Sequence, residues 1–332
     1  MAANLSQPYL EAEQRYRSAT STEDKIAALE QMITELPKHK GTEKIYADLK
    51  TKLAKLKKGA DKKGGGPARK TSEYVIEREG AGQIILLGAP NTGKSSIVGA
   101  TTNAPVEITD YPFATRKPIP GAMKFEDIRI QLVDGPSIAP EFFDPFFPPL
   151  VRLADAALLC VDLSSPDCLD QPDQILKILR EVKIELVAGI VADTQRNTSP
   201  RLLPTLLVAT KADAEDADTA LELLRETVGA RLPILPISVR QPETLAALAR
   251  ACFDMFGIVR AYSKAPGKEP DMSAPFILTR GSTVLDFAQR VHKDFLARFG
   301  FARVWGTGKY DGQRVARDYA VQDRDVIELH MS

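Results

Sequence analysis

The sequence predicts an α/β fold built on a mostly parallel sheet with helices on both faces. Short apolar runs carry this prediction: IILLGA, QLVDG, ALLCVDL, TLLVATKAD and ILPIS, with helical segments between several of them. Short apolar strands that alternate with helices are typical of a parallel sheet buried on both sides. The segments before and after these runs follow different patterns, so we expect an additional unit at each end.

Helices are expected at the N-terminal end, over residues 1–57. Apolar residues at helical spacing form one stripe from Ile26 to Leu36 and a second from Ile45 to Leu56. Pro37 ends the first stripe, and PKHKG separates the two. This pattern predicts a helical hairpin.

A basic stretch runs from Lys50 to Lys70 and is interrupted by GGGP. One interpretation is a solvated helix face joined to a flexible linker. The other is a contact with RNA phosphates, because clustered lysines release counterions on binding. Aromatic residues are missing from the stretch, so base stacking is not expected there. Both interpretations stay open.

The C-terminal residues form a small separate unit in this prediction. Residues 263–272 (SKAPGKEPDM) have the composition of a linker, and residues 273–332 follow it. FILT, ARVWG and DVIELHM are expected strands. GSTVLDFAQRVHKDFLARF is an expected helix that begins with a capping box between Thr283 and Asp286.

Composition excludes several classes of protein. The chain has 332 residues with a formal net charge of zero, so any basic patch must be local. It has no apolar run of about 20 residues and no signal-peptide pattern at its start, so we expect a cytoplasmic protein without a membrane span. Cys160, Cys168 and Cys252 form neither a CxxC pair nor a disulfide framework. The three histidines are scattered, which argues against a histidine metal site.

GAPNTGKS, from Gly88 to Ser95, has the spacing of a phosphate-binding loop and follows an apolar strand. Glycines allow backbone N–H groups to curl around an anion, and the following helix adds its positive end. The side chain of Lys94 would neutralise the β- and γ-phosphates, and the Ser95 hydroxyl would ligate Mg²⁺. The expected phosphate-binding residues are Gly88, Asn91, Thr92, Gly93, Lys94, Ser95 and Ser96.

Two further residues are candidates for holding the magnesium ion. Asp134 ends the strand IQLVD, where a carboxylate can bind the Mg²⁺ shell through water. Thr115 lies in DYPFATRKP and would be a second hydroxyl ligand, ordered only when a γ-phosphate is present. In isolation, either segment would be an ordinary turn or loop. With Lys94, these are the expected catalytic residues.

TKAD, from Thr210 to Asp213, follows the strand TLLVA. A carboxylate at Asp213 can accept two hydrogens from guanine, a pair that adenine does not offer. The stem of Lys211 can lie along the base, and Ser238 stands where a further loop would approach it. Alone, TKAD would be a weak signal, but after a phosphate loop it predicts guanine recognition.

Together these stretches resemble a translation-factor-class GTPase, and in particular the Obg superfamily and its developmentally regulated GTP-binding protein (DRG) group. The resemblance is carried by GAPNTGKSS, DYPFATRKPIPG, DGPS, TKAD and PIS, and by the basic segment GTEKIYADLKTKLAKLK. It implies a P-loop NTPase G domain over 75–262, after a helical arm and linker over 1–70. It also implies that 273–332 form a TGS domain, a ubiquitin-like β-grasp unit.

The resemblance further implies a switch that hydrolyses GTP slowly and is linked to ribosomes or RNA through the basic arm and the TGS domain. Asn91 matches the position where related GTPases help to bind K⁺, although turn geometry alone would also explain an asparagine there. Position 138, after DGPS, is Ile138 and not a glutamine that orients water.

The chain departs from the family pattern in four places. Ala114, Ser137 and Thr210 replace a threonine, a glycine and an asparagine, and the span from Asp134 to Thr210 is too short for the small domain that DRG proteins usually insert there. Two alternatives therefore remain: a nucleotide-regulated binding module with little turnover, and an ATP-dependent P-loop enzyme.

Overall fold

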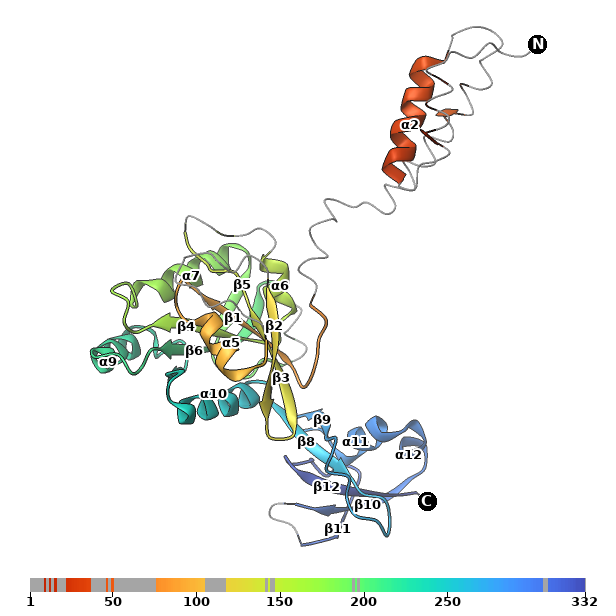
Figure 1. Cartoon of the computed structure of the whole chain (residues 1–332). Coiled ribbons are helices and arrows are strands. Elements are labelled where there is room, and N and C mark those ends of the chain that lie inside the picture. The colour runs from red at the N-terminus through yellow and green to blue at the C-terminus, as the bar shows by residue number, and fades with distance from the viewer. Residues whose placement is uncertain are drawn as a thin grey trace, which may run out of the picture. The chain divides into compact units, whose positions relative to one another are not determined.

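The computed structural model describes residues 9, 12, 15, 16, 22–36, 46, 49, 50, 76–104, 118–140, 143, 147–192, 195, 198–306 and 310–331. By its internal contacts the chain divides into two units, 1–72 and 73–332 (Figure 1). In the first unit, α2 (Thr22–Glu35) covers the first apolar stripe, and its Leu29 and Met32 pack with Tyr9 and Leu49. The lysine-rich segment over 51–70 lies outside the described residues.

Within the described residues, the first sheet of unit 73–332 has seven strands in the order β2-β3-β1-β4-β6-β5, with β7 beside β6. All its pairings are parallel except β2 with β3, which confirms the mostly parallel sheet. The strands are β1 (Gln83–Gly88), β2 (Ile119–Phe125), β3 (Ile128–Asp134), β4 (Ala156–Asp162), β5 (Ile184–Val187), β6 (Arg201–Thr210) and β7 (Ile234–Pro236).

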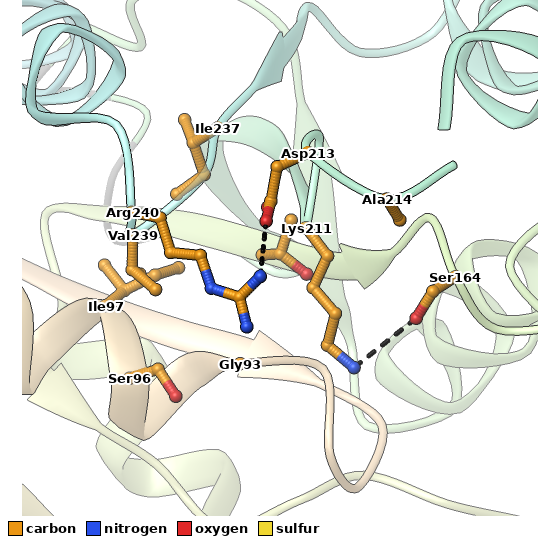
Figure 2. Close-up of a pocket in the computed structure, with 11 residues that line it drawn as sticks. Gly93, Ser96, Ile97, Ser164, Lys211, Asp213, Ala214, Ile237, Val239 and Arg240 are labelled. Carbon is orange, nitrogen blue, oxygen red and sulfur yellow. Dashed lines mark hydrogen bonds and ion pairs between the residues drawn. The ribbon is translucent and has the colours of Figure 1, made fainter. Parts of the chain in front are cut away.

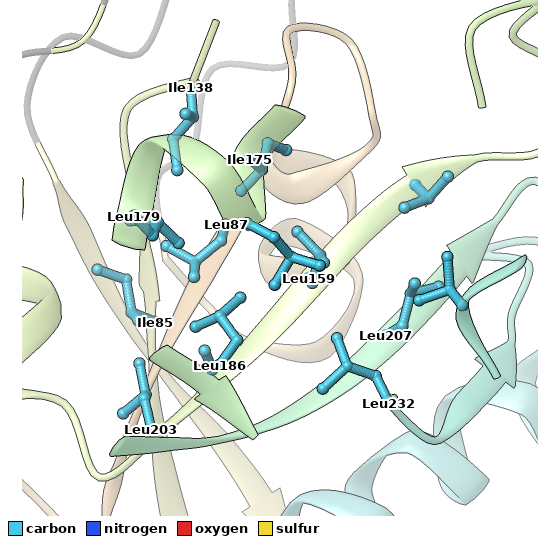
Figure 3. Close-up of a cluster of buried hydrophobic side chains, with 14 of the residues drawn as sticks. Ile85, Leu87, Ile138, Leu159, Ile175, Leu179, Leu186, Leu203, Leu207 and Leu232 are labelled. Carbon is cyan, nitrogen blue, oxygen red and sulfur yellow. The ribbon is translucent and has the colours of Figure 1, made fainter. Parts of the chain in front are cut away.

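Helices cover both faces of this sheet, which is why its central strands are apolar throughout. One face packs against α6 (Phe147–Leu153), α7 (Asp170–Glu181) and α9 (Ala217–Val228). Figure 3 shows this cluster, in which Leu87, Leu159 and Leu207 come from β1, β4 and β6. The other face packs against α5 (Lys94–Thr101) and α10 (Pro242–Met255). Cys160 is fully buried in this second cluster, as expected for a core residue.

A second sheet has the order β11-β10-β12-β8-β9 within the described residues. Its strands are β8 (Ile258–Ser263), β9 (Phe276–Thr279), β10 (Phe299–Trp305), β11 (Gln313–Val315) and β12 (Asp325–Met331). Helix α11 (Val284–Val291) packs Phe287 and Ala288 into its core and begins with the expected capping box of Thr283 and Asp286; α12 (Lys293–Ala297) follows. FILT and DVIELHM are strands as predicted, and ARVWG lies mostly within β10.

The second sheet begins earlier in the chain than the boundary at 273 expected from the sequence. Strand β8 lies before the expected linker over 263–272, yet it pairs with β9 and β12. Its residues Val259 and Ala261 belong to the core of the second sheet. The pairing of β8 with β12 joins segments more than 60 residues apart, and no local pattern announces such a contact.

A buried arginine connects the two sheets. Arg260 on β8 is 1% exposed and binds Asp323 through two guanidinium nitrogens. Its third nitrogen donates to Glu126, at 2.6 Å, and to Asp127, at 2.5 Å, in the turn between β2 and β3. Tyr262 also donates to Asp127. The turn of the first sheet is therefore fixed to the first strand of the second sheet.

No helix in the described part of the chain combines the length and the apolar character that crossing a membrane requires.

Candidate functional site

The phosphate loop connects β1 to α5 at the carboxyl edge of the first sheet. A Cβ on Gly88 would lie 2.8 Å from the carbonyl oxygen of Cys160, so the backbone passes too close to β4 for any side chain. Gly93 has φ 81° and caps the N-terminus of α5, a conformation that favours glycine. The loop thus combines tight backbone curvature with a helix N-terminus, the arrangement that binds phosphate.

Lys94 folds back into this loop. Its Nζ donates to the carbonyl oxygens of Gly88, at 3.1 Å, and Ala89, at 2.7 Å, and to the Ser137 hydroxyl, at 3.2 Å. Burial lowers the pKa of Lys94 below its usual value, while the carboxylate of Asp134 opposes this shift. A buried cation held mainly by carbonyl oxygens has no full counter-charge, and phosphate oxygens would supply one.

Ser95 and Asp134 form the next part of the site. The Ser95 Oγ donates to Asp134 Oδ2 at 2.5 Å. Asp134 is 1% exposed, and its Oδ1 is buried with no hydrogen-bond partner among the described residues. Burial raises the pKa of Asp134, although the hydrogen bond from Ser95 and the charge of Lys94 oppose the increase. A hydroxyl beside a carboxylate with an unused oxygen fits the oxygen ligands that Mg²⁺ prefers.

A cavity of about 270 Å³ lies beside the phosphate loop (Figure 2). Asp213 lines it and accepts a hydrogen bond from Arg240 at 3.0 Å. A hydrogen bond from Ser238 lowers the pKa of Asp213, with a further contribution from Arg240. Lys211 extends along the cavity and pairs with Asp162 at 2.6 Å. The lining residues are Gly93, Ser96, Ile97, Ser164, Thr210, Lys211, Asp213, Ala214, Ile237, Val239 and Arg240.

Thr210 ties the cavity to the phosphate loop. Its hydroxyl lies 3.0 Å from the carbonyl oxygen of Thr92 and 3.1 Å from that of Val161. The Thr210 hydroxyl therefore lies between the phosphate loop and β4 and contacts both.

The structure brings together the predicted residues from Gly88 to Ser96 with Asp134, Thr210, Lys211, Asp213 and Ser238 along one edge of the sheet. Thr115 lies outside the described residues, so its placement stays a prediction. Sequence reasoning missed Arg240 and Asp162 as partners of Asp213 and Lys211. Arg240 lies two residues after Ser238, so a cation in the expected base loop was the available signal.

Comparison with known families agrees with this geometry. Residues 83–192 match the model described as 50S ribosome-binding GTPase, and residues 259–331 match the TGS domain model. The chain joins a P-loop GTPase domain to a C-terminal TGS domain. The TGS match begins within β8, in agreement with the pairing of that strand.

Relatives of this chain include developmentally regulated GTP-binding proteins. An uncharacterized GTP-binding protein of Methanocaldococcus jannaschii is 27% identical, over 92% of this chain and 92% of its own length. Developmentally-regulated G-protein 1 of Arabidopsis thaliana is 25% identical, over 92% and 90%. Ribosome-interacting GTPase 1 of Saccharomyces cerevisiae is 24% identical, over 93% and 99%.

The archaeal alignment extends over 367 residues, more than the 332 of this chain. That relative therefore contains segments that this chain lacks.

Among solved structures, the chain resembles a point mutant of S. thermophilus NFeoB bound to GMPPNP, with a TM-score of 0.39 and 17% identity. The match covers 52% of this chain and 62% of that one, less than two thirds of its length.

Replacing Asp213 with asparagine is expected to abolish the preference for GTP over ATP. The amide keeps the size of the side chain but replaces an acceptor with a donor, so one of the two guanine bonds is lost. The loss of one hydrogen bond to a charged group predicts a fall in GTP affinity of roughly 10- to 150-fold. Competition of GTP and ATP against a fluorescent GDP analogue measures the effect.

Asp218→Asn is the matched control for this prediction, because it makes the same change of charge on the exposed first turn of α9. Its GTP-to-ATP ratio is expected to equal that of the wild type. An unchanged ratio in Asp213→Asn would show that another group selects the base.

Proposed function

We propose that this GTPase hydrolyses GTP slowly to GDP and phosphate and works as a switch whose GTP-bound form engages a ribosome or another RNA-containing partner. The packing of Ile138 is the observation that supports slow turnover. Ile138 follows the DGPS segment, is 1% exposed, and its backbone N–H donates to the carbonyl oxygen of Gly88. A buried aliphatic side chain at this position does not orient an attacking water, so hydrolysis depends on charge neutralisation alone.

The residues of the site have distinct roles in this proposal. Lys94 exchanges its bonds to loop carbonyls for the β- and γ-phosphate oxygens. Ser95 and Asp134 would hold Mg²⁺, and Thr115 would join them when the γ-phosphate is present. When bound, Mg²⁺ neutralises charge on the phosphates. Asp213 selects guanine. The stem of Lys211 lies along the base, while its ammonium pairs with Asp162.

Support for an RNA-containing partner comes from the chain and from its relatives. The lysine-rich segment from 50 to 70 carries clustered positive charge, which favours phosphate binding. The yeast relative is named a ribosome-interacting GTPase, and the matching G-domain model is described as ribosome-binding. A cytoplasmic location is part of the proposal and is supported by Cys160, Cys168 and Cys252, which are free thiols.

A second candidate is a nucleotide-regulated binding module that scarcely turns over. It is favoured by Ser137, which stands where the family pattern has glycine. The Ser137 hydroxyl accepts a hydrogen bond from the Lys94 ammonium. Single-turnover hydrolysis of pre-bound GTP distinguishes the two candidates. Phosphate release on a scale of minutes to hours supports the switch, whereas GTP recovered intact supports the binding module.

Turnover is expected to be at least about tenfold faster in K⁺ than in Na⁺, a difference of about 1.4 kcal/mol in the barrier. The reason is that Asn91, at φ 62° in the phosphate loop, stands where a monovalent cation would neutralise charge between the β- and γ-phosphates. Phosphate release is measured in each salt, with and without purified ribosomes, and Asn91→Ala is expected to remove the difference between salts.

Each arm of this experiment has its own contradicting result. Equal rates in K⁺ and Na⁺ would discard the cation site. Failure of the protein to sediment with ribosomes at low salt in any nucleotide state would end the proposal of a ribosomal partner, while leaving the nucleotide site intact.

A further inference from the structure

The sheet of the TGS domain has one face packed on its core and one face turned away from it. Ala302, Val304, Val315, Ile327 and Leu329 belong to the core, on which α11 also packs. Because side chains alternate along a strand, their neighbours lie on the opposite face. We call this set the TGS outer face: Phe301, Arg303 and Trp305 on β10, Arg314 on β11, and His330 on β12.

Planar groups are stacked across the strands of the TGS outer face. Phe301 and His330 are register partners, with ring centroids 4.3 Å apart and planes only 8° from parallel. The Arg314 guanidinium lies 4.1 Å from the centroid of the Phe301 ring. Trp305 has the ammonium of Lys264 at 4.7 Å from its ring. Three strands thus contribute to a stack that ends in an exposed guanidinium on the edge strand β11.

The same face carries an excess of positive charge. Arg303 and Arg314 are register partners on β10 and β11, both exposed, and like charges directly opposite each other destabilise a sheet. Neither arginine forms an ion pair with any residue that the structure describes. Glu328 on β12 is the register partner of Arg303 on its other side, but it is buried and paired with Lys264 and with His330. Two exposed arginines side by side, with a single buried acid that already has other partners, favour an anionic ligand.

We propose that the TGS outer face binds single-stranded RNA, an inference that rests on the proposed RNA-linked function and assigns it a site. Arg303 and Arg314 pair with successive phosphates, because guanidinium groups are the strongest phosphate partners among side chains. An unpaired base extends the stack on the Arg314 plane, since bases stack on guanidinium and aromatic planes. Tyr310, 86% exposed in the turn before β11, provides a second stacking ring.

The stack favours RNA over an acidic peptide. Peptide carboxylates would neutralise the two arginines, but they have no aromatic ring to stack on the Arg314 guanidinium and on the exposed Tyr310. The remainder of this side of the sheet is already occupied, because Arg260 and Tyr262 on β8 contact the turn between β2 and β3. RNA is therefore confined to the part formed by β10, β11 and β12.

Trp305 provides a local probe because it is the single tryptophan of the chain. Titration of the full-length protein with a uridine RNA of about 12 nucleotides, within the range of single-strand site sizes, is expected to quench its fluorescence saturably. In the double variant Arg303→Ala/Arg314→Ala the RNA concentration for half-quenching rises at least about tenfold. The slope of log affinity against log salt becomes shallower by about 1.4, the loss of two phosphate contacts on a single strand. If RNA bound only to the lysine-rich arm, the double variant would keep the half-quenching concentration of the wild type.

Arg290→Ala is the matched control, because this exposed arginine lies on α11, which packs on the core side of the sheet. Equal half-quenching concentrations in the double variant and in Arg290→Ala would overturn the proposal. So would quenching by a glutamate peptide of the same length but not by RNA, which would identify an acidic protein as the partner. Binding of a fluorescent GDP analogue is measured in every variant. If the wild-type protein does not bind the GDP analogue, the proposed switch is overturned, whereas the RNA result still stands.

Discussion

Replacing Lys94 with alanine is expected to reduce the affinity for both GTP and GDP at least about 100-fold, or about 2.8 kcal/mol. The Lys94 ammonium is 5% exposed and lies among the phosphate-loop carbonyls, with only Asp134 as a nearby opposing charge among the described residues. Phosphate oxygens at this position would form charge-assisted hydrogen bonds with the Lys94 ammonium, which is shielded from water. The loss of such bonds is expensive because the phosphates then lose the cationic side chain of the loop.

The same substitution is expected to have little effect on folding. Burial lowers the pKa of Lys94, which means that the folded protein disfavours the charged side chain. Thermal unfolding of Lys94→Ala without nucleotide should therefore match the wild type within a few degrees. Lys124→Ala, at an exposed position on β2, is the matched control and should retain full nucleotide affinity. GDP affinity in Lys94→Ala within threefold of the wild type would disprove the assignment of this loop as the phosphate site.

The residues predicted for the nucleotide site lie close together in the structure, except Thr115, which lies outside the described residues, because the relationships on which their prediction rests are local. Lys94 and Ser95 follow β1 within a few residues. Asp134 ends β3 and Asp213 follows β6, two strands that the apolar pattern reveals. Parallel strands bring their carboxyl ends to one edge, so the motifs meet without any knowledge of the pairing order. The fold class followed from the same apolar runs, and the structure contains the sheet that they predict.

The features that were missed depend on contacts between distant segments. The pairing of β8 with β12 sets the start of the second sheet, and Ile258 carries no local sign of it. In the sequence, Arg260 resembles any arginine of an amphipathic strand. Its three acidic partners come from two other parts of the chain, so only the folded structure identifies them. The approach of Arg240 to Asp213 likewise depends on two loops that meet only in the folded protein.

The cluster around Arg260 bears on the proposed switch because it fixes the turn between β2 and β3. The turn that it binds, at Glu126 and Asp127, joins β2 to β3, and β3 ends at Asp134 in the nucleotide site. The residues before β2 include Thr115. The TGS domain is thus attached to the antiparallel hairpin that connects the two expected magnesium-binding segments.

Replacing Arg260 with methionine is expected to lower the free energy of unfolding by about 3 kcal/mol, the lower end of the range for breaking a buried ion pair. The lower end applies because the partner acids are 23–42% exposed and regain some hydration. Methionine keeps most of the packing against Phe125 and Phe253. Urea unfolding followed by Trp305 fluorescence should show the midpoint lowered by about 1.5 M, for a slope of about 2 kcal/mol per M.

Arg324→Ala is the control, since Arg324 is 62% exposed, lies 4.0 Å from Glu126 and should contribute less than about 1 kcal/mol. Acid gives an independent test. Burial alone would raise the pKa values of Asp127 and Asp323, but their hydrogen bonds outweigh it: those from Tyr262 and Arg260 hold Asp127 below its usual value, and those from Arg260 do so for Asp323. Their stabilisation is therefore complete above the unfolded pKa of 3.8 and is lost as the pH falls through the lower folded values. The difference between wild type and Arg260→Met should shrink over that range, whereas a difference independent of pH would show that packing, and not the ion pairs, joins the TGS domain to the hairpin.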